Sequence, residues 1–335
     1  MDKKVVELLK KMTLEEKIGQ LNQYSGFWDV TGPVPTAGSS AKKYQDLKAG
    51  LVGAMLNVKG VRNIYKLQKI AVEETRLGIP LLFGFDVIHG YKTISPIPLA
   101  EAASWDLKAI QRSAEIAAEE AASAGINWTF APMVDITRDA RWGRVMEGAG
   151  EDPFLGSKIA SARVKGFQGD LSSKKNIIAC AKHFAGYGFV ESGKEYNTVD
   201  VSNETLHNTI FPTFKACLEA GVRSFMNSFS QLNGIPATGN RWLQRDFLKG
   251  DWDFKGFVVS DWGSIKELVT HGYARDSVQA AEIAINAGSD MDMESGVYVK
   301  FLHELVKNGN MVSLKTSDAA NYRVWFIGIP ITFTY

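Results

Sequence analysis

Short, nearly continuous apolar runs recur along the chain, and most of them end at a polar or charged residue. Runs without polar alternation are typical of strands that are buried on both faces of a parallel sheet. We therefore predict seven strands, at residues 51–56, 79–85, 126–134, 177–181, 222–226, 257–259 and 284–291. The last run is the least regular, because Asn286, Ser289 and Asp290 interrupt it.

Helical patterns separate these runs. Thr13 and Glu16 have the spacing of a capping box, so a helix is predicted to begin there. Asp106 is the expected N-cap of a second helix, which ends before Gly125. A similar helix is predicted over residues 202–220.

Strands that alternate with helices predict an α/β fold, either an open doubly wound sheet or a closed barrel. The polar residues favour the barrel, because they follow nearly every predicted strand, whereas an open sheet gathers its ligand groups at one switch point. These residues are Asp86, Arg138, Lys182, His183, Asn227 and Asp261. We therefore predict a (β/α)8 TIM barrel with an incomplete or irregular strand set, since seven strands are counted where a barrel needs eight.

Charge and composition narrow the range of partners. The 335 residues carry 38 Lys and Arg against 37 Asp and Glu, a net charge of +1. No nucleic acid and no membrane partner is therefore expected, and a neutral small molecule fits better. The chain as given has no signal-peptide core and no long apolar span, so we expect it to be soluble, with the compartment open. Cys180 and Cys217 have neither a disulfide framework nor zinc spacing, and both are expected to be buried.

Three strand ends carry candidate chemistry. Asp261 follows a buried run, where a carboxylate is costly unless it is paired or faces a pocket, so it is either functional or the cap of the next helix. Lys182 and His183 suit a polyhydroxylated or anionic ligand, or else form a satisfied core histidine beside a solvated lysine. Asp86 and His89 lack the further ligands of a metal site, and hydrogen bonds from Asp86 to a sugar diol are the better interpretation.

A basic and aromatic group adds to these candidates. Arg138, Arg141 and Arg144 lie close to acidic residues in one loop, where local ion pairs are expected for two of them and one is enough to bind a substrate. Trp262 stands next to Asp261, where its ring can stack on a sugar. The sequence has no dinucleotide-binding glycine motif, Walker motif or nucleophile elbow, so no cofactor is predicted.

Five motifs, taken together and in order, resemble the signatures of the glycoside hydrolase family 3 β-glucosidases. They are GFDVIHG at residues 84–90, RDARWGRVMEGAGED at 138–152, KHF at 182–184, the stretch 225–239, and VVSDWG at 258–263. The order and spacing match across about residues 10–310. The resemblance implies the catalytic barrel of such an enzyme, which removes a terminal glucose from β-glucosides or oligosaccharides.

The resemblance also implies roles for individual residues. Asp261 matches the nucleophile of a retaining mechanism, which forms a glycosyl-enzyme intermediate. Asp86, Arg144, Lys182 and His183 match residues that bind the hydroxyl groups of the sugar in the innermost subsite.

Two aromatic positions and one loop refine this assignment. Trp262 matches a ring that flanks the next subsite, and Phe229 stands where many members carry Tyr, so a hydroxyl near the nucleophile is lost. Residues 184–193 lack the Asp-x-His dyad that the single-domain β-N-acetylglucosaminidases of the family carry there. The β-glucosidase branch is therefore the better match.

The second carboxyl group is the main departure from the family. In the β-glucosidase branch the general acid/base usually comes from an α/β sandwich domain after the barrel. We expect this chain to divide into a barrel at residues 1–310 and an atypical apolar tail at residues 311–335, with the sandwich domain absent from the sequence as given. Glu191 and Glu195 are either substitutes or solvated surface acids. Without a general acid, poor leaving groups should react more slowly by about 10²–10⁴-fold.

Two other interpretations stay open. One is an inactive sugar-binding barrel, which binds glucose without turnover. The other is a fragment that needs a partner chain with the sandwich domain and exposes an apolar patch without it. A homo-oligomer is a further assembly to test, and many members of the family are periplasmic or secreted.

Overall fold

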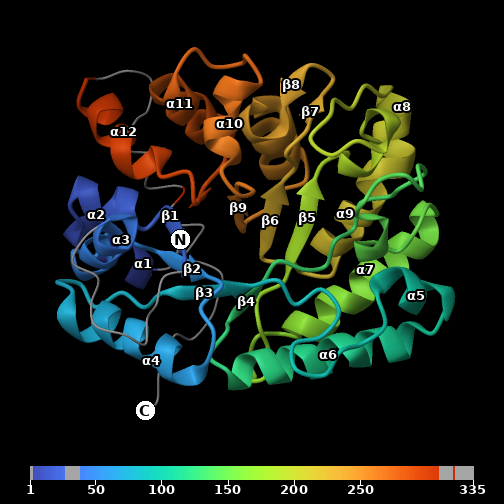
Figure 1. Ribbon diagram of the computed structural model, residues 1–335, viewed down its shortest axis with the longest axis horizontal. Coiled ribbons are helices and arrows are strands. Elements are labelled where there is room, and N and C mark those ends of the chain that lie inside the picture. Colours follow the sequence, from blue (N-terminus) through green and yellow to red (C-terminus); the bar gives the residue numbers. More distant parts are fainter. Residues whose placement is uncertain (1–2, 27–37, 309–319, 321–335) are drawn as a thin grey trace.

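Eight parallel strands form a closed barrel in the computed structural model, which describes residues 3–26, 38–308 and 320 (Figure 1). Five strands pair in the order β10-β1-β2-β3-β4, and three pair in the order β5-β6-β9. Parallel bridges between Trp128 and Ile178 and between Val259 and Met291 join the two sheets. The barrel strands are β1 Asn22–Ser25, β2 Ala54–Leu56, β3 Leu82–Phe85, β4 Trp128–Thr129, β5 Cys180–Phe184, β6 Ser224–Asn227, β9 Phe257–Val259 and β10 Asp292–Met293.

Helices surround the strands as an outer layer (Figure 1). They are α1 Lys3–Lys11, α2 Leu14–Gly19, α3 Gly38–Lys48, α4 Val61–Lys69, α5 Pro98–Ala103, α6 Leu107–Ser123, α7 Pro153–Gln168, α8 Asn203–Thr205, α9 Phe211–Glu219, α10 Ser264–Thr270, α11 Ser277–Ala287 and α12 Val297–Lys307. A π-helical segment, η7, spans Trp242–Asp251, and a short antiparallel pair, β7 Gln231–Leu232 and β8 Ile235–Pro236, follows β6. Within the described part of the chain, no helix is long and apolar enough to cross a membrane.

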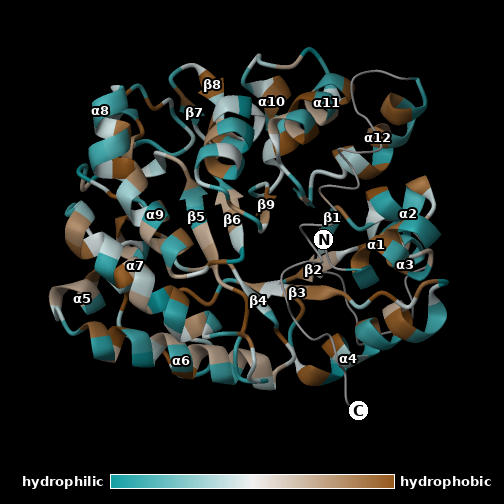
Figure 2. Cartoon of the chain, turned by 180° about the vertical axis from the view of Figure 1, so that it is seen from behind, coloured by the Kyte–Doolittle hydropathy of each residue, from teal (hydrophilic) through white to brown (hydrophobic). Residues whose placement is uncertain are grey.

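The core has an inner and an outer layer, because side chains alternate along each strand. Along β2, Ala54 and Leu56 belong to one apolar cluster with Trp128 and Phe257, whereas Met55 between them belongs to another, and helix residues take part in both. Hydrophobic and hydrophilic residues lie side by side along the helices, as expected of a layer with one face on the core (Figure 2).

The predicted helix starts are confirmed. Thr13 and Glu16 form both hydrogen bonds of the capping box, at 3.2 and 2.9 Å. The Asp106 side chain caps α6 through the backbone N–H groups of Lys108 and Ala109. The helix predicted over residues 202–220 is also present, with Ser202 as its cap and a π-helical segment in its middle.

The strand predictions were wrong for the first and the last barrel strand along the chain. Strand β1 was missed, because its sequence Asn22-Gln23-Tyr24-Ser25 is mostly polar although all four residues are buried. The predicted strand at 284–291 is wrong over its first half, because Ala284 to Ala287 are the end of α11, and the strand β10 begins only at Asp292. Apart from Ala320, the predicted tail at residues 311–335 lies outside the described residues.

Candidate active site

A cavity of about 170 Å³ opens where the C-terminal ends of the strands meet. Six of the seven site residues expected from the sequence line it, although they come from three different strand ends and one loop. The lining residues are Leu56, Asn57, Asp86, Phe130, Arg144, Lys182, His183, Met226, Asp261, Trp262 and Met293. The barrel therefore gathers its polar side chains at the face where active sites of this fold form.

Lys182 and Asp86 form an ion pair across the mouth of the cavity. Lys182 lies in β5 and Asp86 follows β3, and Lys182 Nζ is 2.9 Å from Asp86 Oδ1. The lysine side chain is only 5% exposed, whereas that of Asp86 is 50% exposed. Because Asp86 keeps an open side, this pair presents both donors and an acceptor to a ligand hydroxyl group.

Asp261 lies two residues after β9 and is 8% exposed. Its Oδ1 accepts a 2.7 Å hydrogen bond from the backbone N–H of Trp262. Burial raises the pKa of Asp261 to about 6, although the nearby Lys182 and Arg144 cations and the Trp262 N–H oppose the shift. A carboxylate that is buried beside cations and still faces a cavity is a candidate nucleophile or base.

His183 stands between two carboxyl groups. Its Nδ1 is 2.9 Å from Asp135 Oδ2, and its Nε2 is 3.6 Å from Asp261 Oδ2, which is too long for a hydrogen bond. Burial, together with the cations of Arg144 and Lys182, lowers the pKa of His183 well below its usual value. The imidazole is therefore neutral at pH 7.

Arg144 reaches the cavity from the loop that follows β4. Glu147 holds the guanidinium at two points, with Nε–Oε1 at 2.7 Å and Nη2–Oε2 at 3.0 Å. The same guanidinium lies 5.7 Å from the centre of the Tyr187 ring, which meets His183 edge-on. Arg141 instead pairs with Asp139 at the surface, so Arg144 is the arginine that faces the pocket.

The two aromatic candidates differ in position. Trp262 lines the cavity and is 40% exposed, so its ring is accessible at the rim. Phe229 is 8% exposed and does not line the cavity. Its ring centre lies 5.9 Å from that of Tyr187 and 4.7 Å from that of Tyr196.

The carboxylates that line the cavity are Asp86 and Asp261. Glu191 is exposed at the surface. Glu195 accepts a hydrogen bond from the Tyr187 hydroxyl and so reaches the site only through that ring. Within the described residues, no group of three His, Cys, Asp or Glu side chains is arranged to hold a metal ion.

Sequence reasoning missed several residues in and behind the site, among them Asn57, Met293 and Asp135. Asn57 follows β2, and the rule of polar residues at strand ends could have found it. Met293 belongs to the strand that was placed too early. Asp135 follows the predicted run at 126–134, so the same rule could have found it, although nothing in the sequence shows that it contacts a histidine.

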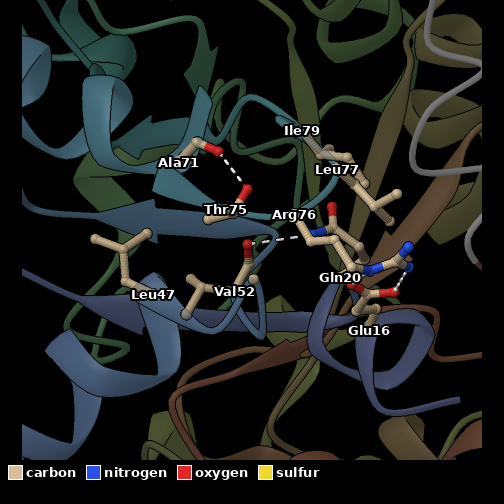
Figure 3. A pocket seen from close by; sticks show the side chains of 10 residues that line it. Glu16, Gln20, Leu47, Val52, Ala71, Thr75, Arg76, Leu77 and Ile79 are labelled. Carbon is tan, nitrogen blue, oxygen red and sulfur yellow. Dashed lines mark hydrogen bonds and ion pairs between the residues drawn. The ribbon is translucent and has the colours of Figure 1, made fainter. Parts of the chain in front are cut away.

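A second pocket lies beneath Glu16, Gln20 and Arg76 (Figure 3). It offers only about 10 Å³, which is the space of one water molecule. Its polar groups are already engaged: Glu16 binds Arg76, and the amide of Gln20 donates to Val52 O at 3.4 Å. This pocket is too small to bind a sugar.

Comparison with known proteins gives a consistent match over most of the chain. Residues 13–326 match the model of the glycosyl hydrolase family 3 N terminal domain. The chain is 43% identical over 319 residues to a periplasmic beta-glucosidase of Salmonella typhimurium, covering 95% of this chain and 41% of that protein. It is 33% identical over 334 residues to a putative beta-xylosidase of Formosa agariphila, covering 93% and 44%.

Solved structures give the same picture. The crystal structure of a beta-glucosidase from Listeria innocua in complex with glucose superposes with a TM-score of 0.92 at 40% identity, covering 98% of this chain and 46% of that one. The chain thus spans less than half the length of these relatives.

Proposed function

The chain belongs to glycosyl hydrolase family 3, and on that premise we propose that its barrel, residues 1–310, is the catalytic domain of a retaining β-glucosidase. The observation that carries the proposal is the position of Asp261. Its buried carboxyl faces the cavity at the end of β9, with the cations of Lys182 and Arg144 lining the same space. The cavity offers both donors and acceptors, as a neutral sugar requires.

In the proposed reaction, a carboxylate oxygen of Asp261 attacks the anomeric carbon of a terminal β-glucoside. The bond from that carbon to the leaving-group oxygen breaks, and that oxygen takes a proton from a general acid. Water then attacks the glycosyl ester, gives up a proton to the same group, and releases Asp261 and the sugar with its original configuration. Asp86, Lys182, His183 and Arg144 bind the sugar hydroxyls, and Trp262 flanks the next subsite.

We assign the general acid to none of the described carboxylates. Asp86 is engaged by Lys182, and Glu195 lies behind Tyr187. The family resemblance points to a second domain for this group. We therefore propose that the barrel by itself hydrolyses activated aryl glucosides far better than alkyl glucosides or oligosaccharides, since a good leaving group needs little protonation.

The test is hydrolysis of an aryl β-glucoside by the purified chain and by Asp261→Asn, each with and without azide. We expect turnover in the parent, none in the variant, and faster turnover of the parent with azide, which attacks the glycosyl ester without a general base. NMR should detect the β-anomer of glucose first. An aryl β-xyloside assayed in parallel decides between glucose and xylose in the innermost subsite. Sugar binding without turnover would favour the inactive barrel instead.

A further inference from the structure

A buried carboxyl group, Asp135, lies behind His183 on the side away from Asp261. The chain after β4 pairs with β5 here: Met133 bridges Lys182, and Val134 N–H donates to Lys182 O at 2.8 Å. This pairing brings Asp135, which is 2% exposed, next to His183. Asp135 Oδ2 lies 2.9 Å from both the backbone nitrogen and the Nδ1 atom of His183.

These contacts fix the positions of the hydrogen atoms. A backbone N–H can only donate, so Asp135 Oδ2 is an acceptor for His183. When Asp135 is ionised, the Nδ1 atom, at the same distance from the same oxygen, must carry the hydrogen. Burial raises the pKa of Asp135 to about 7, so this arrangement belongs to the pH range above that value. Because the ring is neutral, Nε2 has none and presents a lone pair. It has no hydrogen-bond partner among the described residues and faces Asp261 Oδ2 at 3.6 Å.

The charged groups around the ring agree with this arrangement. Asp135 and Asp261 face its two nitrogen atoms, and the cations of Lys182 and Arg144 disfavour a second proton on the ring. The Tyr187 ring meets the imidazole edge-on at 5.2 Å and fills the remaining side.

We propose that Asp135 is a positioning residue that holds His183 in the Nδ1–H tautomer, so that Nε2 accepts a hydrogen bond from one sugar hydroxyl. This inference rests on the proposed function for its role in catalysis. The tautomer itself does not depend on turnover.

The first test is ¹⁵N NMR of the parent chain labelled at its 5 histidines, with His183→Gln to assign the signal. We expect His183 to show a protonated Nδ1 and a bare Nε2 at about pH 8, where Asp135 is ionised. In Asp135→Asn the fraction of His183 with a bare Nε2 should fall, because a neutral amide oxygen is a weaker acceptor for the Nδ1 hydrogen. A hydrogen on Nε2 in the parent overturns the proposal, whether or not the chain is active.

The second test is the rate of hydrolysis of aryl β-glucosides that each lack one hydroxyl group. Asp135→Asn should lower kcat/KM by about 10–100-fold for the full glucoside, the range seen when a partner that orients a histidine is removed. The loss should almost vanish for the one deoxyglucoside that lacks the hydroxyl bound by Nε2. An equal loss on every substrate would mean that Asp135 only maintains the fold, and would overturn the proposal.

Asp46→Asn is a matched control. Asp46, on α3, is 7% exposed and accepts a 2.8 Å hydrogen bond from the hydroxyl of Tyr24 in β1, outside the cavity lining. It should leave the histidine tautomer and the pattern across deoxyglucosides unchanged. If the parent hydrolyses no glycoside, the proposed function fails, and the NMR result still decides the tautomer.

Discussion

The cavity around Asp261 and the small pocket beneath Glu16 both contain a buried acid and a basic partner, but they treat the acid in opposite ways. Arg76 binds Glu16, whose other oxygen accepts the Thr13 N–H at 2.9 Å, and the hydrogen bond from Arg76 lowers the pKa of Glu16. Burial raises the pKa of Asp261, which has one backbone hydrogen bond and open space in front of it.

The difference separates stability from chemistry. The carboxylate of Glu16 is satisfied by the fold and fastens α2 to the segment after α4. The carboxylate of Asp261 is held where its charge is unfavourable until a ligand arrives, which is a common property of catalytic groups. Changes at Asp261 should therefore affect activity far more than changes at Glu16.

The largest expected effect is on catalysis. Asp261→Asn should lower kcat for an aryl β-glucoside by about 10⁴–10⁶-fold, because the amide cannot form the glycosyl ester. Glu16→Gln should stay within about twofold of the parent in the same assay. A variant at Asp261 with near-normal turnover would remove the distinction between the two regions.

The second-largest effect is a gain in stability, because Asp261→Asn removes a buried charge. A carboxyl pKa that is raised to about 6 means that the folded chain binds this proton more tightly than the unfolded chain. Stability is therefore lost as pH rises from about 4 through about 6, by up to about 3 kcal/mol. Asp261→Asn cannot ionise and should be more stable than the parent at pH 7.5. Urea unfolding of the parent and the variant at about pH 4 and at pH 7.5 measures this difference. No gain in stability of the variant at pH 7.5 would contradict the prediction.

The pH dependence of activity sharpens the comparison further. Asp261 must be ionised to attack, so kcat/KM should fall about tenfold per pH unit below about 6. An acid limb near pH 4 would mean that Asp261 titrates like an exposed aspartate. Initial rates with an aryl glucoside between pH 4 and pH 8 give the profile.

The smallest effect is expected at Glu16. Glu16→Gln should lower the free energy of unfolding by about 1 kcal/mol at pH 7, because the capping box weakens and Arg76, which is more than half exposed, loses its partner. The lowered pKa of Glu16 means that this difference shrinks as pH falls below about 4. Urea unfolding of both chains at pH 7 and pH 3.5 checks the size and the trend.

How much the sequence predicts also differs between parts of the molecule. The barrel strands β2 to β6 and β9 are buried on both faces, so their apolar runs are visible, and the polar residues after these runs predict convergence at one face. From the sequence alone, that reasoning predicted that Asp86, Lys182, His183 and Asp261 lie at one face, and all four line the same cavity. It failed for β1, where Asn22 and Gln23 are buried polar residues.

Second contacts are harder to predict than strand ends. Glu147 holds Arg144, three residues before it in the same loop, whereas Asp135 contacts His183 only because the chain after β4 pairs with β5. An apolar run also has no single meaning: Ala284 to Ala287 are buried as part of a helix, although the same residues would suit a strand.

The most direct test of the central claim is trapping of the glycosyl-enzyme. The chain would be incubated with 2-deoxy-2-fluoro-β-glucosyl fluoride, whose fluoride leaves without a general acid, and digested for mass spectrometry. The account predicts one added fluoroglucosyl group, on Asp261. A label on Asp86 or another carboxylate, or turnover of the reagent without any label, would contradict it.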